Sequence, residues 1–299
     1  MQPNSQFLNQ PKHFWANVRT LSQSLGYTNK KTKQIKIPSL TEVISGLQQI
    51  GLRSTHIATE HSQLTPFGQV LFEYFEYRAD VLNNFVKSKL MNANKAKQLF
   101  FELYEQLNPK CILPQNKQKH EKRDYAFFTC IINMLVEANI GGLPCNYDPG
   151  ALTTVTLDGT PLRTLARRVD GAFPSIVNPI AIWEIKEYYY TTTFGSRVAD
   201  GVYETLLDGL ELEELREHEN IDVKHYLMVD DYNTWWNDGR SYLCRMIDML
   251  HMGYVDEVIF GAEVLERLPL LAREWVEIAR QHPEVIRPSL QQMQSLWDE

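Results

Sequence analysis

Three charged residues near the middle of the chain have the types and the spacing that metal-assisted hydrolysis needs. Asp170 is followed, after 13 residues, by Glu184 and Lys186, which lie two apart in the apolar run AIWEIK. Such a run is typical of a buried strand, in which residues two apart emerge on the same face. Burying a carboxylate and an ammonium is costly unless the two groups pair or bind a metal. A strand that carries this pair inward is therefore a candidate functional site.

The chemistry expected of these residues is that of a magnesium site. Asp170 falls at the end of a strand expected at 165–172, and pairing of that strand with the strand of Glu184 would bring two carboxylates together. Two carboxylates and a backbone carbonyl are hard ligands that suit Mg²⁺, an ion that keeps several waters available for reaction. A lysine beside the ion can position or deprotonate the attacking water and offset charge on a phosphate. The predicted cofactor is Mg²⁺.

This pattern resembles the PD-(D/E)xK nuclease superfamily, to which most type II restriction endonucleases belong. The resemblance rests on Asp170 and the Glu-x-Lys that follows it. It implies that Asp170 and Glu184 hold the metal and that Lys186 serves the nucleophilic water. Some members add an acidic residue from the preceding helix, and Glu137 is the matching candidate. A valine stands where many members have a proline before the aspartate.

The segments around these residues are predicted to alternate between helix and strand. We expect helices at 123–139, 196–216 and 240–252, and strands at 152–157, 165–172, 180–186, 223–229 and 254–260. The order α-β-β-β-α-β-α-β predicts an α/β fold, an α+β mixed sheet with helices on both faces. Over roughly residues 123–260 this order is similar to the restriction-endonuclease-like αβββαβ core.

The first part of the chain is predicted to be mainly helical. We expect helices at 13–26, 39–51 and 65–79, with an extended segment at 52–63. Ser39 and Glu42 have the spacing of a capping box. This order of two helices, an extended wing at 52–63 and a third helix resembles a winged helix-turn-helix module. The alternative interpretation is a small helical domain that serves only in packing. A linker at 107–122 places the domain boundary near 115, which predicts a DNA-binding domain at 1–115 and a nuclease domain at 116–299.

Charge is distributed unevenly along the chain, whose formal net charge is −7. Residues 1–41 contain six basic and no acidic residues, and residues 87–123 contain nine basic and three acidic residues. Residues 200–299 contain 22 acidic and eight basic residues. This asymmetry favours a basic face near the N-terminus. We expect Lys30, Lys31, Lys33 and Lys36 to contact DNA phosphates, the alternative being a solvated loop.

Other signals in the sequence narrow the function. No apolar run reaches membrane-spanning length, the four cysteines are scattered, and a cytoplasmic location with reduced thiols is expected. His56 and His61 lack a third ligand nearby. A phosphate-cradling glycine-rich loop, a GxSxG motif, an HNH pattern and the Gln-x-x-x-Tyr signature of RecB-like nucleases are absent. Tyr188 to Tyr190 and Thr191 to Thr193 either contact the DNA backbone or, as we favour, pack.

Three functions remain open from the sequence. The first is a type II restriction endonuclease that cuts double-stranded DNA as a homodimer. The second is a nuclease of another role on the same scaffold, such as phage defence, transposition or repair. The third is a non-catalytic winged-helix regulator whose second domain mediates assembly. The presence of Asp170, Glu184 and Lys186 together favours the first two.

Overall fold

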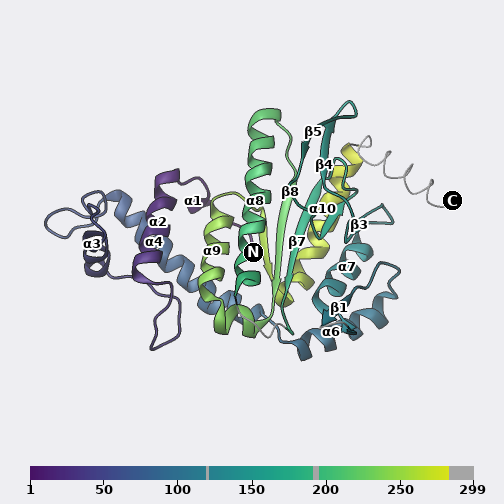
Figure 1. Cartoon of the computed structure of the whole chain (residues 1–299), viewed down its shortest axis with the longest axis horizontal. Coiled ribbons are helices and arrows are strands. Elements are labelled where there is room, and N and C mark those ends of the chain that lie inside the picture. Colours follow the sequence, from purple (N-terminus) through teal and green to yellow (C-terminus); the bar gives the residue numbers. More distant parts are fainter. Residues whose placement is uncertain (119–120, 191–194, 283–299) are drawn as a thin grey trace.

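A five-stranded mixed sheet forms the centre of the molecule (Figure 1). Its strands are β3 (Asn146–Tyr147), β6 (Gly171–Phe173), β7 (Ala181–Glu187), β8 (Lys224–Asp230) and β9 (Glu257–Phe260). They lie in the order β3-β6-β7-β8-β9, antiparallel from β3 to β7 and parallel from β7 to β9. The computed structural model describes residues 1–118, 121–190 and 195–282. The predicted mixed α/β class is confirmed.

Helices cover both faces of this sheet (Figure 1). They are α7 (Phe127–Asn139), α8 (Ser196–Glu219), α9 (Arg240–His251) and α10 (Val264–Gln281). One face packs against α7 and α10, where Trp183 of β7 stacks on Trp275 with ring centroids 5.4 Å apart. The other face packs against α8 and α9 through Leu227 and Val229 of β8. No helix among the described residues is long and apolar enough to cross a membrane.

A glycine next to the candidate site allows two strands to approach closely. Gly171 pairs with Trp183 across the antiparallel β6 and β7. A Cβ atom at residue 171 would collide with the indole ring of Trp183. The Asp-Gly step at 170–171 therefore lets the tryptophan lie flat over the strand, and this packing fixes the backbone that carries Asp170.

Two hairpins lie outside the central sheet. They are β1 (Gln115–Gln118) with β2 (Glu121–Tyr125), and β4 (Thr154–Leu157) with β5 (Thr160–Thr164). The first hairpin occupies the expected linker and delays the start of α7 to residue 127. The second hairpin ends at residue 164, and the next strand, β6, begins at residue 171. The strand predicted at 165–172 is therefore wrong, and Asp170 precedes a strand instead of ending one.

The N-terminal part is helical, as predicted. It contains α1 (Ser5–Leu8), α2 (Lys12–Leu25), α3 (Leu40–Gln49) and α4 (Pro66–Asp80). The capping box at α3 is confirmed, because the Ser39 side chain accepts from the Glu42 N–H and Glu42 accepts in turn from the Ser39 N–H at 2.8 Å. The expected wing at 52–63 contains no strand and is reduced to a single bridge between Ala58 and Leu64.

Helical segments, interrupted at residues 90–92, lead from this part toward the sheet. They comprise the π-helical stretch η1 (Val81–Val86), α5 (Lys87–Lys89) and α6 (Ala93–Leu107). Phe100 of α6 packs in the same core as Phe127 of α7. The remaining short elements, η2 (Tyr232–Asp238) and η3 (Gly261–Glu263), follow β8 and β9.

Candidate active site

Strand β7 directs Glu184 and Lys186 toward α8. Lys186 Nζ donates to Glu184 Oε2 at 2.9 Å, and both side chains are buried. Asp170 lies just before β6, and its Oδ2 accepts from the backbone N–H of Ile185 at 2.7 Å. The structure thus brings together the three residues that the sequence pattern selected, because the alternation of a strand puts Glu184 and Lys186 on one face.

Three further charged side chains, which the sequence analysis missed, join this site. Arg167 Nη1 lies 2.8 Å from Glu184 Oε1 and 2.7 Å from Asp208 Oδ2. Glu204 Oε2 accepts from Lys186 Nζ at 3.0 Å and lies 3.3 Å from Arg167 Nη2. Glu204 and Asp208 are four apart on α8 and so share a helix face, which was the available signal. The ionic cluster, as we call it, consists of Arg167, Asp170, Glu184, Lys186, Glu204 and Asp208.

Burial and mutual charge set the protonation of the ionic cluster. Burial and the nearby Glu184 carboxylate raise the pKa of Asp170 to about 6 and that of Asp208 to about 7. Burial also acts to raise the pKa of Glu184, but Lys186 and Arg167 outweigh it and hold that pKa below its usual value. Burial would lower the pKa of Lys186, yet Glu184 and Asp170 raise it above its usual value. At neutral pH Glu184 is therefore ionised and Lys186 is a cation.

The carboxylate oxygens of the ionic cluster are of the chemical type that a hard divalent cation prefers. Two buried carboxylate oxygens, Glu184 Oε1 and Asp208 Oδ1, have no hydrogen-bond partner among the described residues, although Glu184 Oε1 has its ionic contact with Arg167. Mg²⁺ usually takes one or two protein carboxylates and completes its shell with water and phosphate oxygens. Within the described ranges no three His, Cys, Asp or Glu side chains are grouped so that they could hold a metal ion. Asp170 and Glu184 would therefore share the ion with solvent and substrate.

Glu137 does not reach the ionic cluster. It lies in the last turn of α7, where its Oε2 accepts from the Lys110 N–H at 2.9 Å. Glu137 is too far away because α7 packs on the face of the sheet that carries Trp183, whereas Glu184 points from the opposite face. The additional acid beside Glu184 is Asp208 of α8, and the expectation for Glu137 is corrected accordingly.

The basic loop between α2 and α3 is only partly as expected. Lys30, Lys31 and Lys33 are exposed. Lys36 is not free, because its Nζ lies 2.7 Å from Oε1 of Glu42, the residue that also caps α3. All four lysines were expected to contact DNA phosphates, and Lys36 differs from the other three in having this acidic partner.

The other residues considered from the sequence have structural roles. His56 Nε2 hydrogen-bonds with Asn17 Oδ1 at 2.8 Å, and the described residues contain no metal-binding group that would include it. Tyr188 packs against Trp235 with ring centroids 5.4 Å apart, and the Tyr189 hydroxyl donates to Asp230. Packing, the favoured role, is therefore confirmed for these two tyrosines. Thr191 to Thr193 lie outside the described residues.

Comparison with known protein families assigns the two parts of the chain to separate domains. Residues 1–85 match Domain of unknown function DUF7690, and residues 91–275 match Domain of unknown function DUF7687. No curated protein and no solved structure matches the chain. The predicted boundary near 115 stays a prediction, and the two matches meet between residues 85 and 91. The longer match contains the whole ionic cluster and covers more than half of the sequence. The chain therefore belongs to the DUF7687 family.

Proposed function

We propose that this DUF7687 protein is a Mg²⁺-dependent endonuclease that hydrolyses phosphodiester bonds in double-stranded DNA. The observation that carries the proposal is the pairing of Lys186 with Glu184 at 2.9 Å beside Asp170, whose carboxylate is held by the Ile185 N–H at 2.7 Å. Buried ion pairs contribute little net stability, because the desolvation penalty offsets their attraction. Strongly perturbed pKa values from burial and specific partners are typical of functional sites.

The order of elements around the cluster supports the same proposal. Helix α7 is followed by the antiparallel strands β3, β6 and β7, then by α8 and the parallel strand β8. This order is similar to the αβββαβ order that the PD-(D/E)xK resemblance implies, with the β4–β5 hairpin inserted between β3 and β6. Asp170 directly precedes β6, and the Glu-x-Lys lies on β7, the strand that pairs with β6.

The charge balance of the ionic cluster favours a bound cation. Four carboxylates face two cations, Arg167 and Lys186. The excess of negative charge contributes, with burial, to the raised pKa values of Asp170 and Asp208. A divalent ion held by Asp170 and Glu184 would offset this excess, and when bound it supplies the activation of water that hydrolysis needs.

The protein's own cations then have distinct tasks. The Lys186 ammonium is held between Glu184 at 2.9 Å and Glu204 at 3.0 Å, so it is positioned to stabilise charge that builds on a phosphate. The Arg167 side chain is partly exposed and its planar guanidinium suits phosphate oxygens. Glu204, at the exposed rim, acts as a positioning residue for Lys186.

One observation favours a second function, that of a non-catalytic DNA-binding regulator. Arg167 lies within 2.8 Å of both Glu184 and Asp208, where it neutralises the two carboxylates as a structural ion pair would. In that case the cluster serves to hold α8 on the sheet, and loss of Lys186 affects stability but no chemistry. A direct test of cleavage separates the two functions.

Within the nuclease proposal we expect a type II restriction endonuclease. The N-terminal module would contact DNA and a homodimer would cut both strands. Defined fragments from a long DNA of mixed sequence would support this form. Unspecific degradation would favour a nuclease of another role, such as defence, transposition or repair.

The deciding experiment is cleavage of long double-stranded DNA by the purified full chain with Mg²⁺. We compare wild type with Asp170→Asn, Lys186→Ala and the control Glu137→Gln, a carboxylate outside the cluster. The first two variants should lose at least about 100-fold in rate, roughly 2.7 kcal/mol, whereas the control should stay within about tenfold. Circular dichroism and DNA binding report whether each variant is folded. Cleavage by wild type that the two cluster variants retain would refute the proposal.

A further inference from the structure

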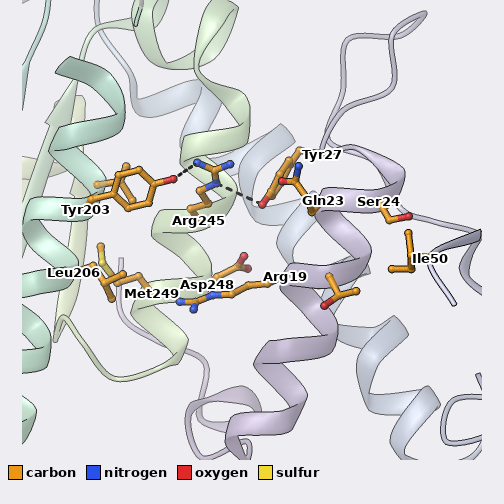
Figure 2. Close-up of a pocket in the computed structure, with 12 residues that line it drawn as sticks. Arg19, Gln23, Ser24, Tyr27, Ile50, Tyr203, Leu206, Arg245, Asp248 and Met249 are labelled. Atoms are coloured by element: carbon orange, nitrogen blue, oxygen red, sulfur yellow. Dashed lines mark hydrogen bonds between the residues drawn. The ribbon is translucent and has the colours of Figure 1, made fainter. Parts of the chain in front are cut away.

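A cavity of about 570 Å³ lies between the N-terminal helices and the helices that cover the sheet (Figure 2). Its walls come from α2 and the end of α3 on one side and from α8 and α9 on the other. The carboxylates of the ionic cluster do not line it. Its volume falls within the range of sites that bind small organic molecules. The cavity is therefore a second candidate site, separate from the one described above.

Two arginines in the cavity have no acidic partner among the described residues. Arg245 donates to the hydroxyl of Tyr203 at 2.9 Å and to that of Tyr27 at 3.4 Å, as Figure 2 shows. Arg19 is exposed, and its Nη2 contacts the sulfur of Met252 at 3.3 Å. Guanidinium groups pair best with carboxylate or phosphate oxygens. A cavity that presents two of them without a counter-charge is suited to an anion.

The carboxylate in the cavity wall does not supply this counter-charge. Asp248 accepts from buried Arg78 at 2.9 Å and from the Tyr74 hydroxyl at 2.6 Å. Its charge is therefore already balanced inside the protein. The cavity as a whole remains positive.

The rest of the wall suits a flat ring. Tyr203 is 51% exposed, and the Arg245 guanidinium lies 5.4 Å from the centre of the Tyr27 ring and 6.0 Å from that of Tyr203. Ile50, half exposed, and Leu206 add apolar surface beside these rings. Tyrosine faces and stacked arginines bind heteroaromatic rings well, because the ring faces attract both π-systems and cations.

We propose that this cavity binds a nucleotide, with the base against Tyr203 and Leu206 and the phosphate at Arg19 and Arg245. The polar side chain of Gln23 is placed to bond the edge of the base or the sugar. The nucleotide is either free in solution or one unit of a nucleic acid strand, and the same chemistry serves both. The proposal does not depend on cleavage by the ionic cluster.

The test for a free nucleotide is isothermal titration calorimetry on the full chain with AMP, GMP, CMP and TMP. At least one should bind with a Kd below about 1 mM, and the matching nucleoside should bind at least about tenfold more weakly, roughly 1.4 kcal/mol. Arg245→Gln and Tyr203→Ala should each weaken binding by at least about tenfold. The matched control is Arg280→Gln, an exposed arginine outside the cavity. Arg19→Gln, on the exposed side, serves if either wall variant fails to fold.

The second arm uses single-stranded and duplex oligonucleotides that carry 2-aminopurine, whose fluorescence rises when the base leaves the stack. A rise with wild type that Arg245→Gln abolishes, without binding of free nucleotides, assigns the cavity to a nucleotide within a strand. Binding of free nucleotides that Arg245→Gln weakens assigns it to a soluble ligand. Neither response, or responses that the cavity variants leave unchanged, would overturn the proposal. These readouts need no cleavage, so failure of the nuclease proposal is scored separately.

Discussion

Replacing Asp248 by Asn should destabilise the protein more than any exposed charge reversal, because it leaves a buried arginine without its counter-charge. Arg78 is 2% exposed and its Nη1 lies 2.9 and 3.0 Å from the two oxygens of Asp248. Asp248 raises the pKa of Arg78 against the lowering effect of burial, so the guanidinium cannot shed its proton. The pair joins α4 of the N-terminal part to α9 on the sheet.

The magnitude follows from the burial of both partners. Removing one member of a buried ion pair costs about 3–5 kcal/mol. For a chain of this length each kcal/mol corresponds to about 2 °C in melting temperature, so Asp248→Asn should lower it by about 6–10 °C. The matched control is Glu266→Gln, which removes an exposed partner of Lys89 at 3.0 Å and should cost less than about 1 kcal/mol.

Differential scanning calorimetry and urea unfolding measure both variants. A double variant, Arg78→Met with Asp248→Leu, should recover at least about half of the loss, since an apolar pair leaves no charge unpaired. A melting temperature of Asp248→Asn within about 2 °C of wild type, less than 1 kcal/mol, would refute the reasoning. Additive losses in the double variant would refute it equally.

Four further predictions follow from the described contacts. Cleavage should require Mg²⁺ or Mn²⁺, and Ca²⁺ should support DNA binding without turnover; full activity in excess EDTA would contradict this. Replacing Lys30, Lys31 and Lys33, the exposed lysines of the basic loop, by Gln should reduce the slope of log affinity against log salt for DNA binding by about two to three units. An unchanged slope would mean that the loop is solvated and does not contact phosphates. Gly171→Ala should cost about 1–3 kcal/mol through overpacking, whereas Gly150→Ala, which has open space around it, should be nearly neutral in urea unfolding. Burial raises the pKa of Asp230 from 3.8 to about 8, so this group should cost wild type stability as pH rises through that window, by up to about 1.4 kcal/mol per unit. Asp170 and Asp208, whose pKa values are also raised, add to the loss at lower pH. Asp230→Asn should therefore show a shallower slope, above all between about pH 7 and 8, and an equal slope in both proteins would exclude a contribution from Asp230.

The ionic cluster was predictable from sequence to the extent that local periodicity determines it. Glu184 and Lys186 share a face because a strand alternates, and this needs no tertiary information. The proximity of Asp170 depended on the pairing of two strands, which adjacency in the sequence made the natural expectation. The capping box at Ser39 is equally local, and it is found as predicted.

The parts that could not be predicted depend on which faces meet. Glu204 and Asp208 share a face of α8, but only the packing of α8 on the sheet turns that face toward Lys186. Glu137 lies outside the ionic cluster for the same reason, because its helix, α7, covers the other face of the sheet. The strand expected at 165–172 failed because β5 pairs with β4 in a separate hairpin, which frees 165–170 to turn Arg167 toward Glu184.

Helix α8 connects the two candidate sites. Tyr203 lines the cavity and its neighbour Glu204 holds Lys186 at 3.0 Å, and consecutive helical residues project about 100° apart. A ligand that packs against Tyr203 therefore acts on the same turn of helix that positions the Lys186 ammonium. A shift of that turn would change the 3.0 Å contact between Glu204 and Lys186. Under both proposals we expect binding at the two sites to be coupled, and because linkage is reciprocal, a ligand in the cavity and a metal ion at the ionic cluster would change each other's affinity by the same factor.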